Sequence, residues 1–475
     1  MTATESADPS VEAPDGPTAP AGRLASGSVR FFSSVAVSIG IQAPTGGLVF
    51  LPALMAELVG ESGPLAFLAA IVVMLPVAAV FGAFSRQFAT AGSVYAFIGR
   101  TLSPVVGFVA CLGLFLTYVS YTSATAAGAA NAAAPLLADV GLHFNWLVPG
   151  LAAWALGWYL SFRPVHFTTV VVLTLEGVAL VLVLIVGIVV IAKGGYQGHS
   201  VSLSPFRPHG IKLSAFVIGL VFAYTGFSGF EGAATLGEEA NLPRRIIPLA
   251  VITSLLVGGG AYVFGSYVET ISYPNATALS KSTVPMISIA HQYLTPWVGT
   301  AVNVAALISI FGAVLACATG GSRLLFALTR DGFVHRGLAA THPRHRSPYR
   351  ALAVTEVLAL AGMLIFAGDA PLDVFFYTAQ YGVYLILSVY LLTCIAGLVY
   401  AFRRHRPPLM LTALAGVAVL GVVIKYSVVP IPAYPFDRLL VAAAVTLAGA
   451  VAVAALPSYR RRLMAAPTFR PDGTA

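Results

Sequence analysis

Apolar stretches of about 20 residues recur along almost the whole chain, and each is long enough to cross a bilayer core of about 30 Å. Only 9% of the residues are charged, whereas an ordinary soluble domain has about 25%. A water-soluble core does not account for this composition, so lipid is the expected solvent. The sequence therefore predicts an all-α polytopic protein of the cytoplasmic membrane.

Twelve transmembrane helices are predicted from the apolar runs and from the proline, glycine and charged residues between them. Their expected ranges are 30–58, 64–85, 104–132, 145–161, 166–192, 213–240, 246–269, 296–322, 350–367, 371–400, 408–428 and 436–457. Segment 1–28 lacks the apolar centre of a signal peptide, so we expect a disordered cytosolic N-terminal tail there. A cytosolic C-terminal tail is expected at 461–475.

The basic residues predict the orientation of the chain. If the N-terminus is cytosolic, all but six of the 26 lysines and arginines fall on the cytosolic side. The exceptions are Lys193, Arg207, Lys212, Lys281, Lys425 and Arg438. Because cytoplasmic loops carry an excess of basic residues, both termini are expected in the cytosol. This distribution, and not a nucleic-acid partner, accounts for the net charge of +8.

The first predicted helix is interrupted near its middle. Pro44 removes a backbone donor and clashes with the preceding turn, and Gly46 and Gly47 tolerate non-helical backbone angles. Segment 42–47 is therefore expected to unwind. Taken alone, such residues are also common in membrane helices for packing and kinks.

The sixth predicted helix has the same feature, because Gly226, Gly229 and Gly232 surround an intramembrane carboxylate, Glu231. Two interrupted helices that lie five helices apart and run in opposite directions indicate a transporter built from inverted repeats. Irregular backbone at membrane depth is tolerated where it is buried in protein or lines a cavity, so we expect a cavity at these interruptions.

Free backbone groups in this cavity would suit an amino acid. Amides in segment 45–47 would present the positive end of a helix dipole to a carboxylate, and carbonyls in segment 224–227 would accept an ammonium group. The predicted substrate-binding residues are Gln42, Thr45, Gly46, Gly47, Tyr121, Thr225, Phe227, Ser228 and Phe230. Their polar side chains are neutral, which disfavours a strongly charged substrate.

Three stretches resemble the amino acid/polyamine/organocation permease superfamily. They are GFEGAATLGEEANLPRRIIPLAV (229–251), AGSVYAFIGRTLSPVVGFVACLGLFLTY (91–118) and SRLLFALTRDGFVHRGLAATHPRHRSPYRAL (322–352). The resemblance covers about residues 30–460. It departs from the family pattern at GIQAPTGGLVF (40–50), where a Gly-Ser-Gly core is more usual.

This resemblance implies a LeuT-like fold with a 5+5 inverted repeat, discontinuous helices one and six, and two additional C-terminal helices. The transporter domain would span residues 29–460. Its two repeats would occupy about 30–192 and 213–400, followed by the last two helices at about 408–457.

Two carboxylates are candidates for proton coupling. Glu176 lies ten residues from His166, or about 15 Å into the membrane, where an ionised carboxylate costs several kcal/mol unless it is paired. A structural carboxylate is the alternative. Some similar permeases carry a lysine near this position, and in similar exchangers the carboxylate that matches Glu231 couples proton state to opening. Ser309 is a candidate sodium ligand opposite helix one, with packing as its alternative.

At the cytosolic end of helix eight, Arg323, Arg330 and Asp331 are expected to form a structural or gate salt bridge. No zinc-type HExxH motif or nucleophile constellation favours an enzyme, and no repeated filter motif favours a channel.

The predicted function is secondary active transport of a small neutral amino acid by alternating access, with a related amine as the alternative substrate. Proton symport is preferred, and sodium symport and substrate exchange stay open. The expected partners are the substrate, H⁺ and the bilayer. We expect no cofactor and no resident metal, and the sequence leaves the oligomeric state open.

Overall fold

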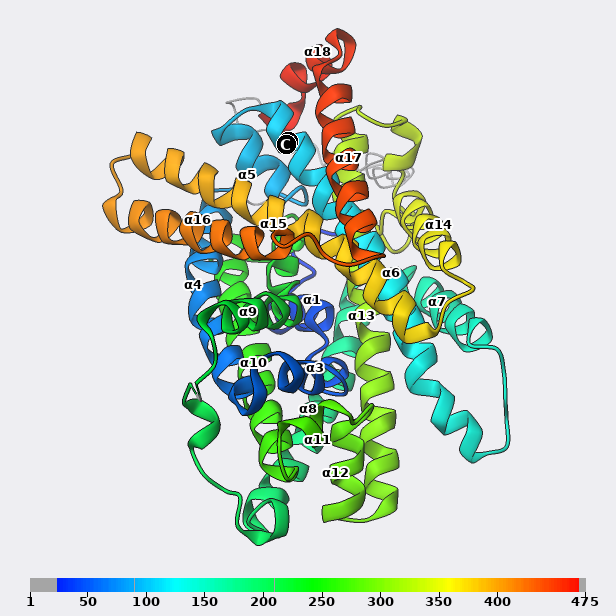
Figure 1. The fold of residues 1–475 in the computed structure, drawn as a ribbon. Coiled ribbons are helices and arrows are strands. Elements are labelled where there is room, and N and C mark those ends of the chain that lie inside the picture. Colours follow the sequence, from blue (N-terminus) through cyan, green and yellow to red (C-terminus); the bar gives the residue numbers. More distant parts are fainter. Residues whose placement is uncertain (1–23, 89, 209, 470–475) are drawn as a thin grey trace, which may run out of the picture.

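The computed structural model describes residues 24–88, 90–208 and 210–469. In these ranges the chain consists of helices joined by loops, and the only strand-like contact is an isolated bridge between Val29 and Ala240 (Figure 1). The predicted all-α class is therefore confirmed. Of the predicted tails, positions 1–23 and 470–475 lie outside the described residues.

In the part of the chain that the structure describes, the helices follow one another without a sheet between them. The first part of the chain contains α1 (Phe31–Gln42), α2 (Pro44–Gly47), α3 (Leu51–Val59), α4 (Gly63–Gln87), α5 (Val94–Thr101), α6 (Pro104–Asp139), α7 (Leu147–Ser161) and α8 (Val165–Ala192). The remainder contains α9 (Leu213–Phe227), the 3₁₀ helix η4 (Phe230–Leu236), α10 (Pro243–Ser272), α11 (Ala276–Ser280), α12 (Pro285–Tyr293), α13 (Pro296–Arg330), α14 (Tyr349–Ile365), α15 (Pro371–Arg403), α16 (Pro407–Val428), α17 (Phe436–Ala455), α18 (Pro457–Ala465) and the 3₁₀ helix η6 (Pro467–Phe469).

Nine helices of the described ranges are long and apolar enough to cross a membrane, so the chain is a multi-pass membrane protein. The difference from the predicted twelve has a physical origin. The first predicted span is divided into three pieces, and α7 and α14 have only 15 and 17 residues. At 1.5 Å per residue they measure about 23 and 26 Å, less than a bilayer core of about 30 Å. The twelve-helix arrangement stays a prediction.

Both predicted interruptions are present in the structure. α1 ends at Gln42, and Ala43 adopts a left-handed conformation with φ 39° before Pro44 starts α2. α9 ends at Phe227, and Gly229 has φ 110°, a conformation that favours glycine, before η4 begins. The predicted unwinding of segment 42–47 is wrong in its extent, because Pro44–Gly47 forms α2; proline is tolerated in the first turn of a helix, where its missing amide would have no intrahelical partner.

The interrupted helix α1 lies at the centre of the molecule, in contact with α8, α10 and α13 (Figure 1). Every residue from Ser33 to Gln42 is buried. A helix that is buried on all sides is a core element and not a lipid-facing one. In contrast, α16 and α17 have mostly exposed surfaces.

The C-terminal segment packs back onto α5. The Phe469 ring lies 4.8 Å from the Tyr95 ring, and the Arg100 Nε donates a hydrogen bond of 2.6 Å to the Thr468 carbonyl. Thr468 and Leu463 are buried. Residues 463–469, within the range predicted as a tail, therefore contact the helical body.

Candidate substrate site

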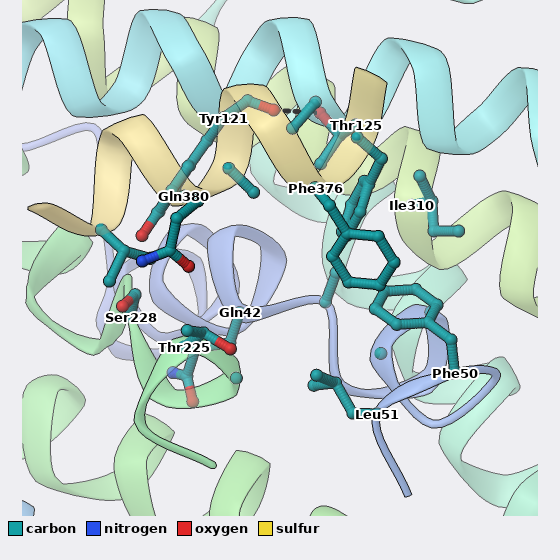
Figure 2. Close-up of a pocket in the computed structure, with 18 of the residues that line it drawn as sticks. Gln42, Phe50, Leu51, Tyr121, Thr125, Thr225, Ser228, Ile310, Phe376 and Gln380 are labelled. Carbon is teal, nitrogen blue, oxygen red and sulfur yellow. Dashed lines mark hydrogen bonds between the residues drawn. The ribbon is translucent and has the colours of Figure 1, made fainter. Parts of the chain in front are cut away.

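A cavity lies between the two helix interruptions, and Figure 2 shows its lining. The lining comes from the end of α1, from α2, from the start of α3, from the end of α9, and from the facing sides of α6, α10, α13 and α15. The cavity volume is about 110 Å³. Typical small-molecule sites have volumes of about 300–1,000 Å³, so in this conformation the cavity leaves room only for a small metabolite.

The cavity has polar and apolar walls but no charged one among the described residues. Its polar lining residues are Gln42, Tyr121, Thr125, Thr225, Ser228, Tyr262 and Gln380. Phe50 forms edge contacts with Phe375 and Phe376, at ring distances of 4.9 and 5.6 Å. In Figure 2 the side chains of Gln42, Ser228 and Gln380 lie away from this aromatic group. Such a lining suits a molecule with one polar and one apolar end.

The backbone amides at the first interruption are already bonded within the protein. The Thr45 amide donates to Glu176 Oε1 at 3.1 Å, and the Gly46 amide donates to Ser309 Oγ at 3.0 Å. The Gly47 amide donates to a backbone carbonyl of the same turn at 2.9 Å. The prediction that these amides are free for a substrate carboxylate is therefore wrong for this structure.

Glu176 and Ser309 reach the interruption from two helices that enclose α1. Glu176 comes from α8 and Ser309 from α13, and both are buried. The Glu176 carboxyl also faces the hydroxyl groups of Thr45 and Ser309. The structure thus brings two predicted coupling residues together at helix one. They lie behind the cavity, since neither belongs to its lining.

The second interruption is organised by Glu231, which is fully buried. Its carboxyl accepts hydrogen bonds from the Tyr118 hydroxyl at 2.8 Å, the Gly229 amide at 3.1 Å, and the Tyr390 hydroxyl. Three separate segments therefore meet at one carboxylate. An opening movement of α9 and η4 relative to α6 and α15 would have to break the bonds from Tyr118 and Tyr390.

Ser38 connects the two interrupted helices. Its hydroxyl on α1 donates to the Phe230 carbonyl at 2.8 Å and accepts from the Ala233 amide at 2.8 Å. A single side chain of α1 therefore satisfies a backbone donor and a backbone acceptor of η4. This contact makes the two interruptions one structural unit.

The structure places six of the predicted binding residues in the cavity lining. They are Gln42, Gly46, Gly47, Tyr121, Thr225 and Ser228. Thr45, Phe227 and Phe230 lie outside it. Phe227 packs against Tyr262 and Phe230 against Tyr390, at ring distances of 5.8 and 5.3 Å. The direction of a side chain around an irregular segment is fixed by its backbone angles, which residue types alone do not specify.

Sequence reasoning missed several residues of this region. Gln380, Phe375 and Phe376 on α15 line the cavity, and Tyr390 and Ser38 support the interruptions. The only signal for the α15 residues was their position in the tenth predicted helix, which has many aromatic residues. Nothing in the sequence separated those that face the cavity from those that serve packing.

A model of the amino acid permease family matches residues 29–455. The chain belongs to this family. The match covers most of the 475 residues, including both interruptions and every residue of the cavity lining.

Curated proteins that are similar to this chain include transporters of putrescine, of branched-chain amino acids and of methylthioribose. The permease is 26% identical to the low-affinity putrescine importer PlaP of Escherichia coli K12, over 62% of this chain and 66% of the importer. It is 26% identical to the branched-chain amino acid permease BcaP of Bacillus subtilis, over 78% and 80% of the two chains. A methylthioribose transporter of the same Bacillus is 25% identical, over 70% and 74%.

In this permease, ion pairs seal the side of the molecule where α1 begins. Glu239 pairs with Arg323 and Glu238 with Arg330, the latter at 2.9 Å. Both arginines of the predicted salt bridge are therefore ion-paired, but their partners are glutamates of the loop after η4 and not Asp331. Asp331 takes part in neither and accepts a hydrogen bond of 2.7 Å from Tyr95.

These two ion pairs, which we call the seal, lie next to the segment that precedes α1. The Val29 amide donates to the Glu239 carbonyl at 3.0 Å, which holds the segment before α1 against the loop after η4. The cavity lining extends the other way, to Leu54 on α3. No residue of the two ion pairs belongs to the cavity lining.

We predict that the two ion pairs differ in their contribution to stability. Glu239→Gln leaves Arg323 buried without a charge partner, which costs about 3–5 kcal/mol. Its pair has side-chain exposures of 2% and 4%, whereas the Glu238 pair has 21% and 24% and is worth about 1 kcal/mol. The matched control is Glu238→Gln. Unfolding in a titration with sodium dodecyl sulfate, followed by circular dichroism, measures both. Equal losses of unfolding free energy in the two variants would contradict the prediction that the buried pair contributes more than the exposed pair.

Proposed function

We propose that this permease is a secondary active transporter that moves a small neutral amino acid across the cytoplasmic membrane by alternating access. The observation that carries this proposal is the cavity between the two helix interruptions, whose lining has no charged side chain among the described residues. Its polar lining offers hydrogen bonds to a backbone-like group, and Phe50, Phe375 and Phe376 offer an apolar surface to a side chain.

The proposed architecture has twelve membrane-spanning segments, with α1 to α8 and α9 to α15 as two inverted repeats and α16 and α17 as additional helices. Support comes from the position of the interruptions, each in the first segment of its repeat. Both termini would lie in the cytosol, which agrees with the excess of basic residues on that side.

A neutral substrate is favoured over a dication such as putrescine because no carboxylate lines the cavity among the described residues. Burying an ammonium group without an anionic partner is costly. The bonded amides at Thr45 and Gly46 give a reason for a second candidate, a related monoamine, which needs no site for a carboxylate. An amino acid would instead use side-chain donors such as Gln380 for its carboxylate.

Glu176 is the proposed site of proton coupling. Its carboxyl holds the first interruption through the Thr45 amide, so a change in its protonation changes a bond that fixes helix one. A protonated carboxyl is a weaker acceptor than a carboxylate. Sodium symport through Ser309, or exchange without an ion, are the alternatives to this mechanism.

Uptake into proteoliposomes tests both substrate and coupling. We expect a labelled neutral amino acid to accumulate when a proton gradient is imposed, and not with a sodium gradient alone. In Glu176→Gln, proton-driven accumulation should fall by about tenfold or more, because glutamine cannot bind or release a proton in this pH range. Exchange of internal for external substrate should persist, because glutamine keeps a carbonyl acceptor for the Thr45 amide. The control is Glu57→Gln, at an exposed position.

Three outcomes of this assay count against the account. Accumulation of an amine and of no amino acid would replace the neutral amino acid with the second candidate. Uptake that requires internal substrate would identify an exchanger. Proton-driven accumulation by Glu176→Gln would remove the coupling role of Glu176.

We predict that Gln380→Glu shifts selectivity toward cationic substrates. Among the residues that the structure describes, the new carboxylate would be the only charge of the cavity lining. A buried opposite charge stabilises a bound ammonium group by more than 1 kcal/mol, or about tenfold in affinity. Competition by cationic and neutral amino acids against labelled substrate measures the change. Gln87→Glu, at an exposed position of α4, is the matched control. Unaltered competition would exclude Gln380 from substrate contact.

A further inference from the structure

A second concave site lies on the outer surface of the permease, between the end of α4 and the start of α10. Three arginines and three apolar residues line it, namely Arg86, Arg244, Arg245, Pro248, Leu249 and Ile252. It does not share a residue with the substrate cavity. It also does not depend on the proposed transport function.

The three arginines lie at one membrane boundary. Arg86 is in the last turn of α4, and Arg244 and Arg245 are in the first turn of α10, and both helices are long and apolar enough to cross a membrane. All three side chains are exposed. The helix dipole of α10, which has 30 residues, adds positive potential at the same place.

These guanidinium groups have no acidic partner among residues 24–88, 90–208 and 210–469. The two acids nearest to them in the sequence of the preceding loop, Glu238 and Glu239, are bound by Arg330 and Arg323. Three unneutralised charges in one hollow repel one another and attract an anion. A guanidinium group binds phosphate oxygens in a bidentate geometry.

The apolar half of the site runs from the arginines toward the membrane interior. Pro248, Leu249 and Ile252 follow Arg245 along α10, and Leu249 is 55% exposed. α4 and α10 are in contact here, since a Cβ atom at Gly82 would lie at an ordinary van der Waals distance of 3.6 Å from Pro248. The hollow is thus basic at the boundary and apolar below it.

We propose that this site binds one anionic phospholipid, with its phosphate on the three arginines and an acyl chain along Leu249 and Ile252. The order of charge and apolar surface along the membrane normal matches an amphipathic lipid and not a free anion. Basic pockets between membrane helices at the cytosolic boundary bind anionic headgroups in this way. Since α10 follows the loop that carries Glu238 and Glu239, the lipid would hold the helix next to the ion-paired seal.

Native mass spectrometry of the full-length protein in detergent tests the proposal. The probe is an equal mixture of phosphatidylglycerol and phosphatidylcholine with identical acyl chains. We expect phosphatidylglycerol adducts to exceed phosphatidylcholine adducts by about tenfold in the unmodified protein, and the two to be nearly equal after Arg86→Gln, Arg244→Gln and Arg245→Gln are combined. The control combines Arg344→Gln, Arg404→Gln and Arg406→Gln, which remove the same charge from exposed loops.

The proposal is overturned if the first triple variant keeps its preference, if the control loses it, or if the unmodified protein shows none. Competition with glycerol phosphate distinguishes a lipid from a free anion, because displacement by the soluble compound at equal concentration would show that the acyl chain contributes nothing. If the triple variant does not fold, as judged by circular dichroism, Arg86→Gln alone is used. It should lower the preference by about threefold to fivefold, and an unchanged preference would contradict the site.

Discussion

Every backbone group at the two helix interruptions must be satisfied by the protein itself, because the hydrocarbon core of a membrane supplies no water. The structure meets this requirement with side chains from other helices. Glu176 and Ser309 bond the amides of the first interruption, and Glu231 and Ser38 bond those of the second. Four side chains therefore determine where the irregular segments lie, and the cavity between these segments follows from their positions.

This arrangement separates binding from support. The groups that satisfy the backbone lie behind the irregular segments, so the cavity itself keeps a neutral polar and aromatic lining. The same bonds also connect the two interruptions. Ser38 ties α1 to η4, which carries Glu231, and the loop after η4 carries the ion-paired Glu238 and Glu239.

Sequence reasoning succeeded where residue type determines local backbone. Pro44 and Gly229 predicted both interruptions, and the apolar runs predicted the all-helical membrane class. It also selected Glu176 and Ser309, but it expected free amides that these two residues occupy. Gln380 and Tyr390 were missed because their positions relative to the cavity and to Glu231 arise from contacts between helices that are distant in the sequence. The hydrophobic periodicity and the composition of a helix carry no information on such contacts.

The central claim is that substrate binds between the two interruptions. A cryo-electron microscopy structure, determined with a saturating amount of the compound that proteoliposome uptake identifies, tests it most directly. The account predicts density for that compound in the cavity, with its polar end between Gln42, Thr225 and Gln380 and its apolar end against Phe50 and Phe376. Density at another place, with this cavity filled by side chains, would contradict the account.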